Sequence, residues 1–162
     1  MQNQKLTSQL AKSPQTQIAT ELSPTPSASQ TTIVQSLPSP KVKTLKDVQD
    51  ALIANTNIKD HSAILPLLKT DTVNFIVMSS GCCPPKTAKD ALDSLNYIDD
   101  GIPFDFEQNS TLVKTLKSKN ERLTNAFIGL SKNKEQLVAY TIDDKNQVTQ
   151  IEVSASYKFY TQ

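Results

Sequence analysis

The chain has 162 residues, a mass of 17.8 kDa and a formal net charge of +1. With three glycines and two cysteines it is neither collagen-like nor a disulfide scaffold, and no run of about 18 apolar residues occurs that could span a membrane. Its 17 basic and 16 acidic residues leave almost no excess positive charge, whereas nucleic-acid binding needs a basic surface to displace counterions from phosphates. We therefore expect neither a membrane span nor a nucleic-acid partner.

The first 43 residues differ in composition from the rest of the chain. Of residues 1–40, 25 are Ser, Thr, Gln or Pro, and none of the nine aromatic residues of the chain lies before residue 44. Such a segment has too few apolar groups to offset the entropy of ordering it. We predict a disordered tether over residues 1–43 and a single folded domain over residues 44–162.

The amino-terminal residues do not have the pattern of an export signal. A secretory signal needs a basic start followed by 7–15 apolar residues, but residues 1–20 never contain more than two consecutive apolar positions. The chain as given therefore predicts no export. A Ser/Thr/Pro/Gln tether ahead of a small domain also resembles the segment behind the anchor of bacterial envelope proteins, so an extracytoplasmic location is expected if the start is incomplete.

The folded part opens with two helical patterns. Thr44 and Asp47 form a capping-box pattern ahead of an apolar stripe, which predicts a helix over residues 44–55. Asp60 can cap a second, short helix, which Pro66 should kink because proline removes one backbone donor.

A strand and a third helix follow. Residues 72–79 (TVNFIVMS) are β-branched and aromatic with apolar side chains on both faces, which predicts a strand covered on both sides. A turn is expected at residues 81–85. Thr87 and Asp90 repeat the capping pattern and predict a helix over residues 87–98.

Residues 99–162 predict a loop, a helix and an antiparallel meander of three strands. Residues 99–109 are acidic and aromatic and suit a loop with a short strand at 104–107, and Ser110 can cap a helix that ends at Lys119. The expected antiparallel strands are 125–131, 136–142 and 148–158. Apolar and polar residues alternate in the last strand, so one face of the sheet should meet the core and the other water or a partner. The fold class is α+β, with N-terminal helices packed on a curved antiparallel sheet.

The order of these elements resembles the NTF2-like (SnoaL-like, cystatin-like) superfamily over residues 44–160. The segment LLKTDTVNFIV and the closing VAYTIDDKNQVTQIEV look like that superfamily's opening strand and final hairpin. The resemblance implies a cone formed by the curved sheet and the helices, in which the enzymes of the superfamily carry Asp, His or Tyr. This chain adds a helix around 110–119, and no acid–base pair matches those positions, so no catalytic residue is carried over.

The leading hypothesis is a non-catalytic module that binds a small apolar ligand or a protein partner. Its pocket, inside the cone, is expected to be lined by Phe75, Val77, Phe127, Tyr140 and Tyr157. The resemblance also implies a possible homodimer through the open sheet face. No cofactor or metal is expected.

The adjacent pair Cys82-Cys83 supports a second hypothesis, a thiol redox or metal-responsive domain. Adjacent cysteines can close a strained, easily reduced disulfide, place two thiolates near one soft metal ion, or remain two free thiols at a turn. A zinc site usually needs four ligands, and the lone histidine, His61, is not at a motif spacing from the cysteines. The three alternatives stay open at this point.

A third hypothesis is a small isomerase or hydrolase of the SnoaL type. Its acid–base residues would come from four candidates, Tyr97, Tyr140, His61 and Asp105. His61 adjoins Asp60, but neighbouring helix positions point about 100° apart and do not face each other. The acidic residues of the 99–107 segment could bind calcium, although a solvated loop accounts for them better because their spacing does not fit an EF-hand.

Overall fold

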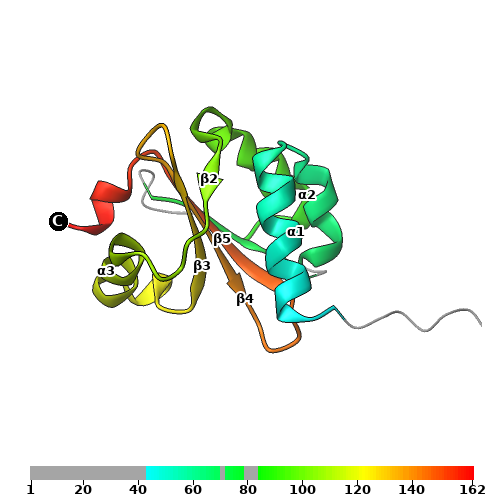
Figure 1. Cartoon of the computed structure of the whole chain (residues 1–162). Helices are drawn as coiled ribbons and strands as arrows, with labels where there is room; N and C mark the ends of the chain where they lie inside the picture. Colours follow the sequence, from blue (N-terminus) through cyan, green and yellow to red (C-terminus); the bar gives the residue numbers. More distant parts are fainter. Residues whose placement is uncertain (1–42, 70–71, 79–83) are drawn as a thin grey trace, which may run out of the picture. The chain divides into compact units, whose positions relative to one another are not determined.

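The computed structural model of the protein describes residues 43–69, 72–78 and 84–162 (Figure 1). The α-helices are α1 (Leu45–Asn57), α2 (Ala88–Asp93) and α3 (Thr111–Lys119). The strands are β1 (Asn74–Val77), β2 (Phe104–Asp105), β3 (Ala126–Ser131), β4 (Leu137–Ile142) and β5 (Val148–Ser154). Four 3₁₀ segments are η1 (His61–Leu67), η2 (Ser94–Gly101), η3 (Glu121–Leu123) and η4 (Tyr157–Tyr160).

The strands form one mixed sheet in the order β1-β5-β4-β3-β2. The meander β3-β4-β5 is antiparallel as expected, and β2 adds to the free edge of β3. At the opposite edge β1 runs parallel to β5, with Asn74 opposite Gln150 and Val77 opposite Val153. The α+β class is confirmed, but the sheet is not purely antiparallel, because β1 runs parallel to β5. This pairing could not be predicted, since the two strands lie more than seventy residues apart and the sequence has no local signal for it.

The helices begin where the capping residues predicted. The Thr44 hydroxyl accepts from the Asp47 N–H at 3.1 Å, and the Asp47 carboxylate accepts from the Thr44 N–H at 2.9 Å, which completes the capping box. The side chains of Asp60, Thr87 and Ser110 cap η1, α2 and α3, each by accepting from the backbone N–H three residues later. The helix expected over 87–98 is α2 followed directly by η2.

One face of the sheet is covered by α1, η1, α2 and η2 (Figure 1). The core between these elements and the sheet includes residues from every one of them and from all five strands. Its largest fully buried members are Leu52, Ile64, Phe75, Leu95, Ile98, Tyr140 and Ile151.

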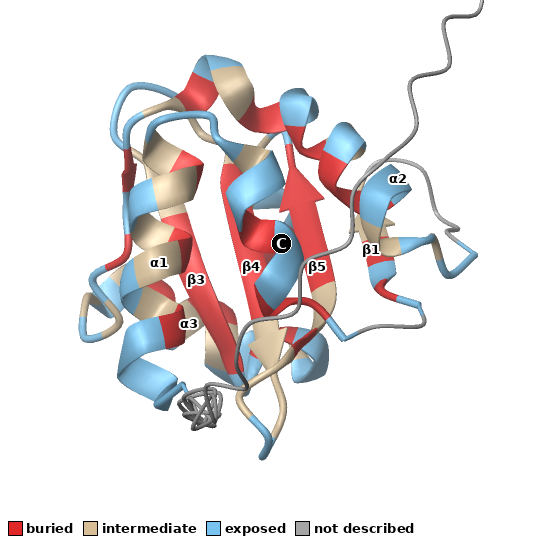
Figure 2. Ribbon diagram, turned by 90° about the vertical axis from the view of Figure 1, so that its right-hand side faces the viewer, coloured by how far each residue is buried: buried red, intermediate tan, exposed pale blue. Residues whose placement is uncertain are grey.

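The other face is covered as well, by α3, η3 and η4. The core on that side contains Val113, Leu116, Leu123, Ala126, Ile128, Leu137, Ala139 and Tyr160. The alternation expected in the last strand is present, but its polar members Glu152 and Ser154 are each 1% exposed. The expectation that this face meets water or a partner is therefore wrong, because the chain after β2 and the carboxyl terminus fold over it. The face expected to pair two copies is covered within one chain, as the burial colours of β3, β4 and β5 show (Figure 2).

The last strand is also shorter than expected. It ends at Ser154 rather than continuing to residue 158. The Ser154 hydroxyl donates to the Ser156 carbonyl, and the Ser156 hydroxyl in turn caps η4 by accepting from the Lys158 N–H. After Ser154, hydrogen bonds made by these serine side chains thus take the place of the strand's backbone hydrogen bonds, and the chain turns. In the described part of the chain, no helix has the length and apolar character that crossing a membrane requires.

Candidate functional site

Four of the five residues expected to line a pocket lie in or against the core under α1 and α2. Phe75, Phe127 and Tyr140 are buried there, and Val77 packs against the same core. The ring of Phe106 stacks on Phe127 with 5.1 Å between ring centroids and lies 6.5 Å from Tyr140. Phe127 and Tyr140 pack against Phe106, and Phe75 and Val77 belong to the same core, so the interior of the expected cone is occupied by the chain's own residues.

The Tyr140 hydroxyl is satisfied inside this core. It lies 2.8 Å from the hydroxyl of Thr56 on α1, and both residues are fully buried. Burial raises the pKa of the Tyr140 phenol, and the hydrogen bond to Thr56 opposes this only partly. Tyr140 is thus a buried neutral group that joins α1 to β4, and it is separated from water.

Tyr157 lies on the other side of the sheet and is not grouped with the other four. It packs against the second core and lines a groove of about 430 Å³. The groove lies between the end of β3, the residues after β2, the start of α3, and η4. Its half-buried apolar residues include Leu112, Leu130 and Tyr157, and its polar residues are Asp105, Glu107, Ser110, Ser131, Lys132 and Lys134.

Charges of both signs flank this groove. The Lys132 ammonium lies 3.8 Å from the Asp105 carboxylate, and both side chains are about half exposed (57% and 52%). Lys134 pairs at 3.3 Å with Asp100, outside the groove. Exposed pairs at such distances are weak and exchange partners readily. The rim can therefore offer both ammonium and carboxylate groups to a ligand that carries the opposite charges.

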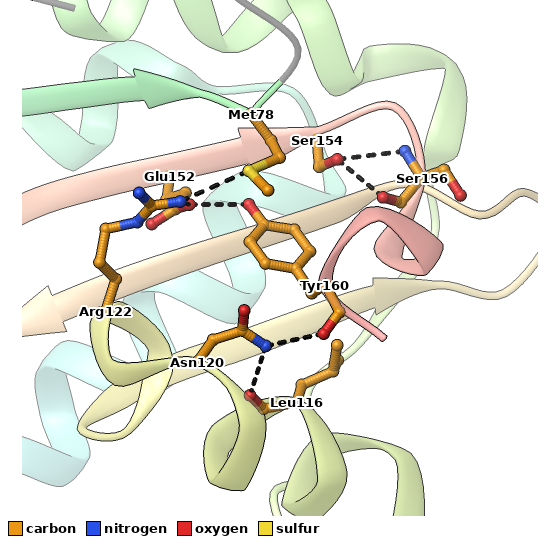
Figure 3. Close-up of polar contacts among 8 residues, drawn as sticks. All are labelled: Met78, Leu116, Asn120, Arg122, Glu152, Ser154, Ser156 and Tyr160. Carbon is orange, nitrogen blue, oxygen red and sulfur yellow. Dashed lines mark hydrogen bonds and ion pairs between the residues drawn. The ribbon is translucent and has the colours of Figure 1, made fainter. Parts of the chain in front are cut away.

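A buried carboxylate ties the second layer to the sheet (Figure 3). Glu152 on β5 accepts at Oε1 from the Arg122 guanidinium at 3.0 Å and from the Tyr160 hydroxyl at 2.8 Å. The same Arg122 nitrogen donates to the sulfur of Met78 at 3.4 Å. Glu152 Oε2 is buried and has no hydrogen-bond partner among the described residues. The cluster joins η3, η4 and the residue after β1 to the middle of β5, which makes it a structural centre rather than an open site.

The environment of Tyr160 reflects this arrangement. Burial raises the pKa of its phenol, and the neighbouring Glu152 charge raises it further, while the Arg122 charge acts in the opposite direction. Its backbone carbonyl accepts from the Asn120 side chain at 2.9 Å, and Asn120 also bonds the Leu116 carbonyl at 3.0 Å (Figure 3). The carboxyl-terminal turn is thus fixed to the end of α3 through its backbone and to β5 through the Tyr160 side chain.

His61 pairs with Asp99 instead of with its neighbour Asp60. Its Nε2 lies 2.8 Å from Asp99 Oδ1 on η2, 38 residues away, and both side chains are largely buried (14% and 27% exposed). Asp60 instead accepts from the Ser62 hydroxyl and the Ala63 N–H at the start of η1. His61 Nδ1 is buried without a hydrogen-bond partner among the described residues. This pairing had no sequence signal, since the two residues lie on separate elements.

The four acid–base candidates are not brought together. Tyr140 is buried in the first core, Tyr97 is 39% exposed on η2, and Asp105 lies on the groove rim. His61 forms its ion pair with Asp99 and not with any of the other three candidates. Within the described ranges no cluster of three His, Cys, Asp or Glu residues could hold a metal ion. Cys82 and Cys83 lie outside the described residues, so the thiol hypothesis stays a prediction.

The comparisons with known proteins add no family to this geometry. Neither a scan against protein-family models nor a search of curated proteins found a match to the chain. The function is therefore argued from the described residues alone.

Proposed function

We propose that the protein is a non-catalytic interaction module that binds an extended segment of a protein partner in the groove beside α3. The observation that carries this proposal is the grouping of Leu112, Leu130 and Tyr157 in one groove of about 430 Å³. All three are half-buried, so part of each remains open to a ligand. Apolar groups that gather in a concave surface with a polar rim are typical of binding sites.

The rim favours a peptide over a wholly apolar ligand. Asp105 and Glu107 lie on the same groove as Lys132 and Lys134, so charges of both signs surround the apolar floor. A peptide supplies N–H and C=O groups along its whole length and side chains of either charge, whereas an apolar ligand would leave these groups without partners. An extended segment of mixed charge is therefore the occupant that this groove suits.

We also propose that the chain is related by descent to the NTF2-like superfamily. This relationship is supported by the order of the opening helices, the first strand and the closing meander. Two features depart from the expectation, namely the parallel pairing of β1 with β5 and the second layer formed by α3, η3 and η4. The proposed binding site is the groove beside α3, on the face of the sheet opposite the core under α1 and α2. It therefore does not depend on the superfamily assignment.

The test is a selection of binding peptides against the full chain. A displayed library of random twelve-residue peptides is screened, and the affinities of the selected peptides are measured by fluorescence anisotropy. The variants Leu112→Ser and Lys132→Glu/Lys134→Glu alter the floor and the rim of the groove. We expect each to weaken binding about tenfold, since loss of one well-placed contact costs about 1.4 kcal/mol.

A matched control is Lys114→Glu, which reverses an exposed charge on α3 that does not line the groove. The proposal requires this variant to bind like the unaltered protein. Peptides that bind all variants equally would place the interaction elsewhere, and failure to select any peptide from the library would count against an interaction module.

A further inference from the structure

A second pocket lies at the other end of β3, where the edge of the sheet is covered by side chains rather than by a strand. Strand β2 pairs only with Leu130 and Ser131, so the first half of β3, which pairs with β4 on its other side, has no strand of the described residues beside it at this edge. A pocket of about 170 Å³ occupies this position, lined by Leu45 from α1, Lys117 from α3, and Phe127 from β3. Figure 2 shows α1 and α3 on the flank of β3, one from each layer. The pocket is thus the place where the two layers approach each other past the edge of the sheet.

Among the residues that the structure describes, Lys117 is the one charged residue that lines this pocket. Its ammonium donates to the Gln108 side-chain oxygen at 3.1 Å, and no carboxylate of the described residues lies within ion-pair distance of it. That oxygen is shared, because it also accepts from the Ile128 N–H at 3.2 Å. Lys117 shares the lack of a carboxylate partner with other described lysines such as Lys114 and Lys119, but it differs from those two in lining a pocket that also holds apolar side chains.

The remaining lining is apolar or neutral. Leu45, Phe127 and Ile142 present carbon surface, while Gln49 and Asn125 offer amide groups. Leu45 is a large apolar residue of this lining that is 48% exposed. Partial burial lowers the pKa of the Lys117 ammonium, which indicates that water solvates it less well than a surface lysine. A cation that has lost solvent without gaining an anion is open to a negatively charged ligand.

We propose that this pocket binds the carboxylate of a small organic acid, with Lys117 as the ion partner and its short hydrocarbon chain against Leu45, Phe127 and Ile142. One ammonium flanked by amides suits a singly charged carboxylate, whereas phosphate is usually held by several N–H donors or by arginine. The volume is below the range of about 300–1,000 Å³ for pockets that hold drug-sized ligands, which limits the ligand to a short chain. The site is separate from the groove, which involves the start of α3 and the end of β3.

The test uses sodium hexanoate as the probe and the full chain labelled with ¹⁵N. Titration should produce saturable amide shifts at Lys117 and at residues 125–127, and it should raise the pKa of the Lys117 ammonium, since an anion favours the charged form. Lys117→Gln should weaken the affinity at least tenfold, while Lys117→Arg should retain most of it. Lys114→Gln, on the exposed side of the same helix, is the matched control and should bind normally.

Two further probes separate the sources of binding. Hexanol has the same chain without the charge and should bind at least tenfold more weakly. Inorganic phosphate should not compete with hexanoate. The proposal is overturned if Lys117→Gln, with a spectrum that shows an intact fold, binds hexanoate as the unaltered chain does. It is equally overturned if hexanol matches hexanoate, or if phosphate displaces it.

Discussion

The side-chain amide of Gln108 occupies the position of a strand residue opposite Ile128. Its Nε2 donates to the Ile128 carbonyl at 2.7 Å, and its Oε1 accepts from the Ile128 N–H at 3.2 Å. Asn57 does the same for Phe104 of β2, with its Oδ1 2.7 Å from the N–H and its Nδ2 3.1 Å from the carbonyl. An exposed strand edge is a template for pairing with another chain. Two amide side chains close this edge of the sheet without a further strand.

Replacing Asn57 with alanine tests this edge protection. Asn57→Ala removes both hydrogen bonds to the Phe104 backbone, so we expect the free energy of unfolding to fall by about 1–3 kcal/mol. Urea denaturation measures the loss. Asn55→Ala is the control, because Asn55 is on the same helix, is half-buried, and makes no side-chain hydrogen bond with the described residues.

The same variant should also self-associate more readily, since it exposes the N–H and C=O groups of β2. Size-exclusion chromatography with light scattering over a range of concentrations reports this. Equal stability of the two asparagine variants, with both monomeric at high concentration, would show that Asn57 does not protect the edge.

Gly129 on β3 lies directly against the ring of Phe106, which leaves no room for a side chain at this position. A Cβ atom at this position would lie 2.6 Å from the ring, far inside van der Waals contact. The ring cannot retreat freely, because it is stacked on Phe127. We expect Gly129→Ala to destabilise the fold by about 1–3 kcal/mol through overpacking. Thermal unfolding followed by circular dichroism measures the change.

The double variant Gly129→Ala/Phe106→Leu separates this contact from other causes. A smaller side chain at position 106 leaves room for the new methyl group, so the double variant should lose less than the sum of the two single variants. Strict additivity of the two losses would contradict the assignment of the glycine to this contact.

The local elements of this fold could be predicted, but their arrangement in layers could not. Thr44, Thr87 and Ser110 mark helix starts through short-range hydrogen bonds that the sequence contains in full. The polar positions of β5 were interpreted as a solvent-facing side. Glu152 is buried nonetheless, because Arg122 and Tyr160 supply partners from 30 and 8 residues away. A polar side chain in a strand does not show whether such partners exist.

The prediction of a ligand pocket failed for a similar reason, namely that residue type alone does not show what surrounds a side chain. Phe75, Phe127 and Tyr140 are apolar or aromatic and inward-facing, as predicted, but a filled core and a ligand pocket have the same residue types. Phe106, which stacks against Phe127 and Tyr140, comes from the 99–109 segment, for which the sequence predicts a loop with a short strand at 104–107. No motif in the sequence marks Lys117 as a binding residue. Only the path of the chain around the edge of β3 places it in a pocket.

The hydrogen bond from Tyr160 to Glu152 should contribute measurably to stability. Tyr160→Phe keeps the buried ring and removes only the hydroxyl, which leaves Glu152 with one donor fewer. A hydrogen bond to a charged group contributes about 1.5–3 kcal/mol, and we expect a loss of that size in denaturant unfolding. Tyr157→Phe is the matched control, because the Tyr157 hydroxyl makes no hydrogen bond with the described residues and its removal should be nearly neutral. Equal effects of the two substitutions would show that the Glu152 contact adds nothing.

The buried tyrosines also predict how stability depends on alkaline pH. The pKa values of Tyr140 and Tyr160 are both raised in the folded state, chiefly by burial, above the ordinary value of 10.0. Above pH 10 the unfolded chain releases these two protons while the folded chain retains them, so the unfolded state binds fewer protons and the free energy of unfolding falls as pH rises. Each proton contributes a slope of about 1.4 kcal/mol per pH unit.

Guanidinium denaturation between pH 9 and pH 11.5 measures this slope. Exposed lysines with raised pKa values, such as Lys158, act in the same direction, so the comparison between variants isolates the tyrosines. Tyr140→Phe and Tyr160→Phe should each reduce the slope by about one proton, or about 1.4 kcal/mol per pH unit, and the double variant by about two. A slope unchanged in both variants would mean that these phenols ionise in the folded protein as readily as in the unfolded chain, which their burial opposes.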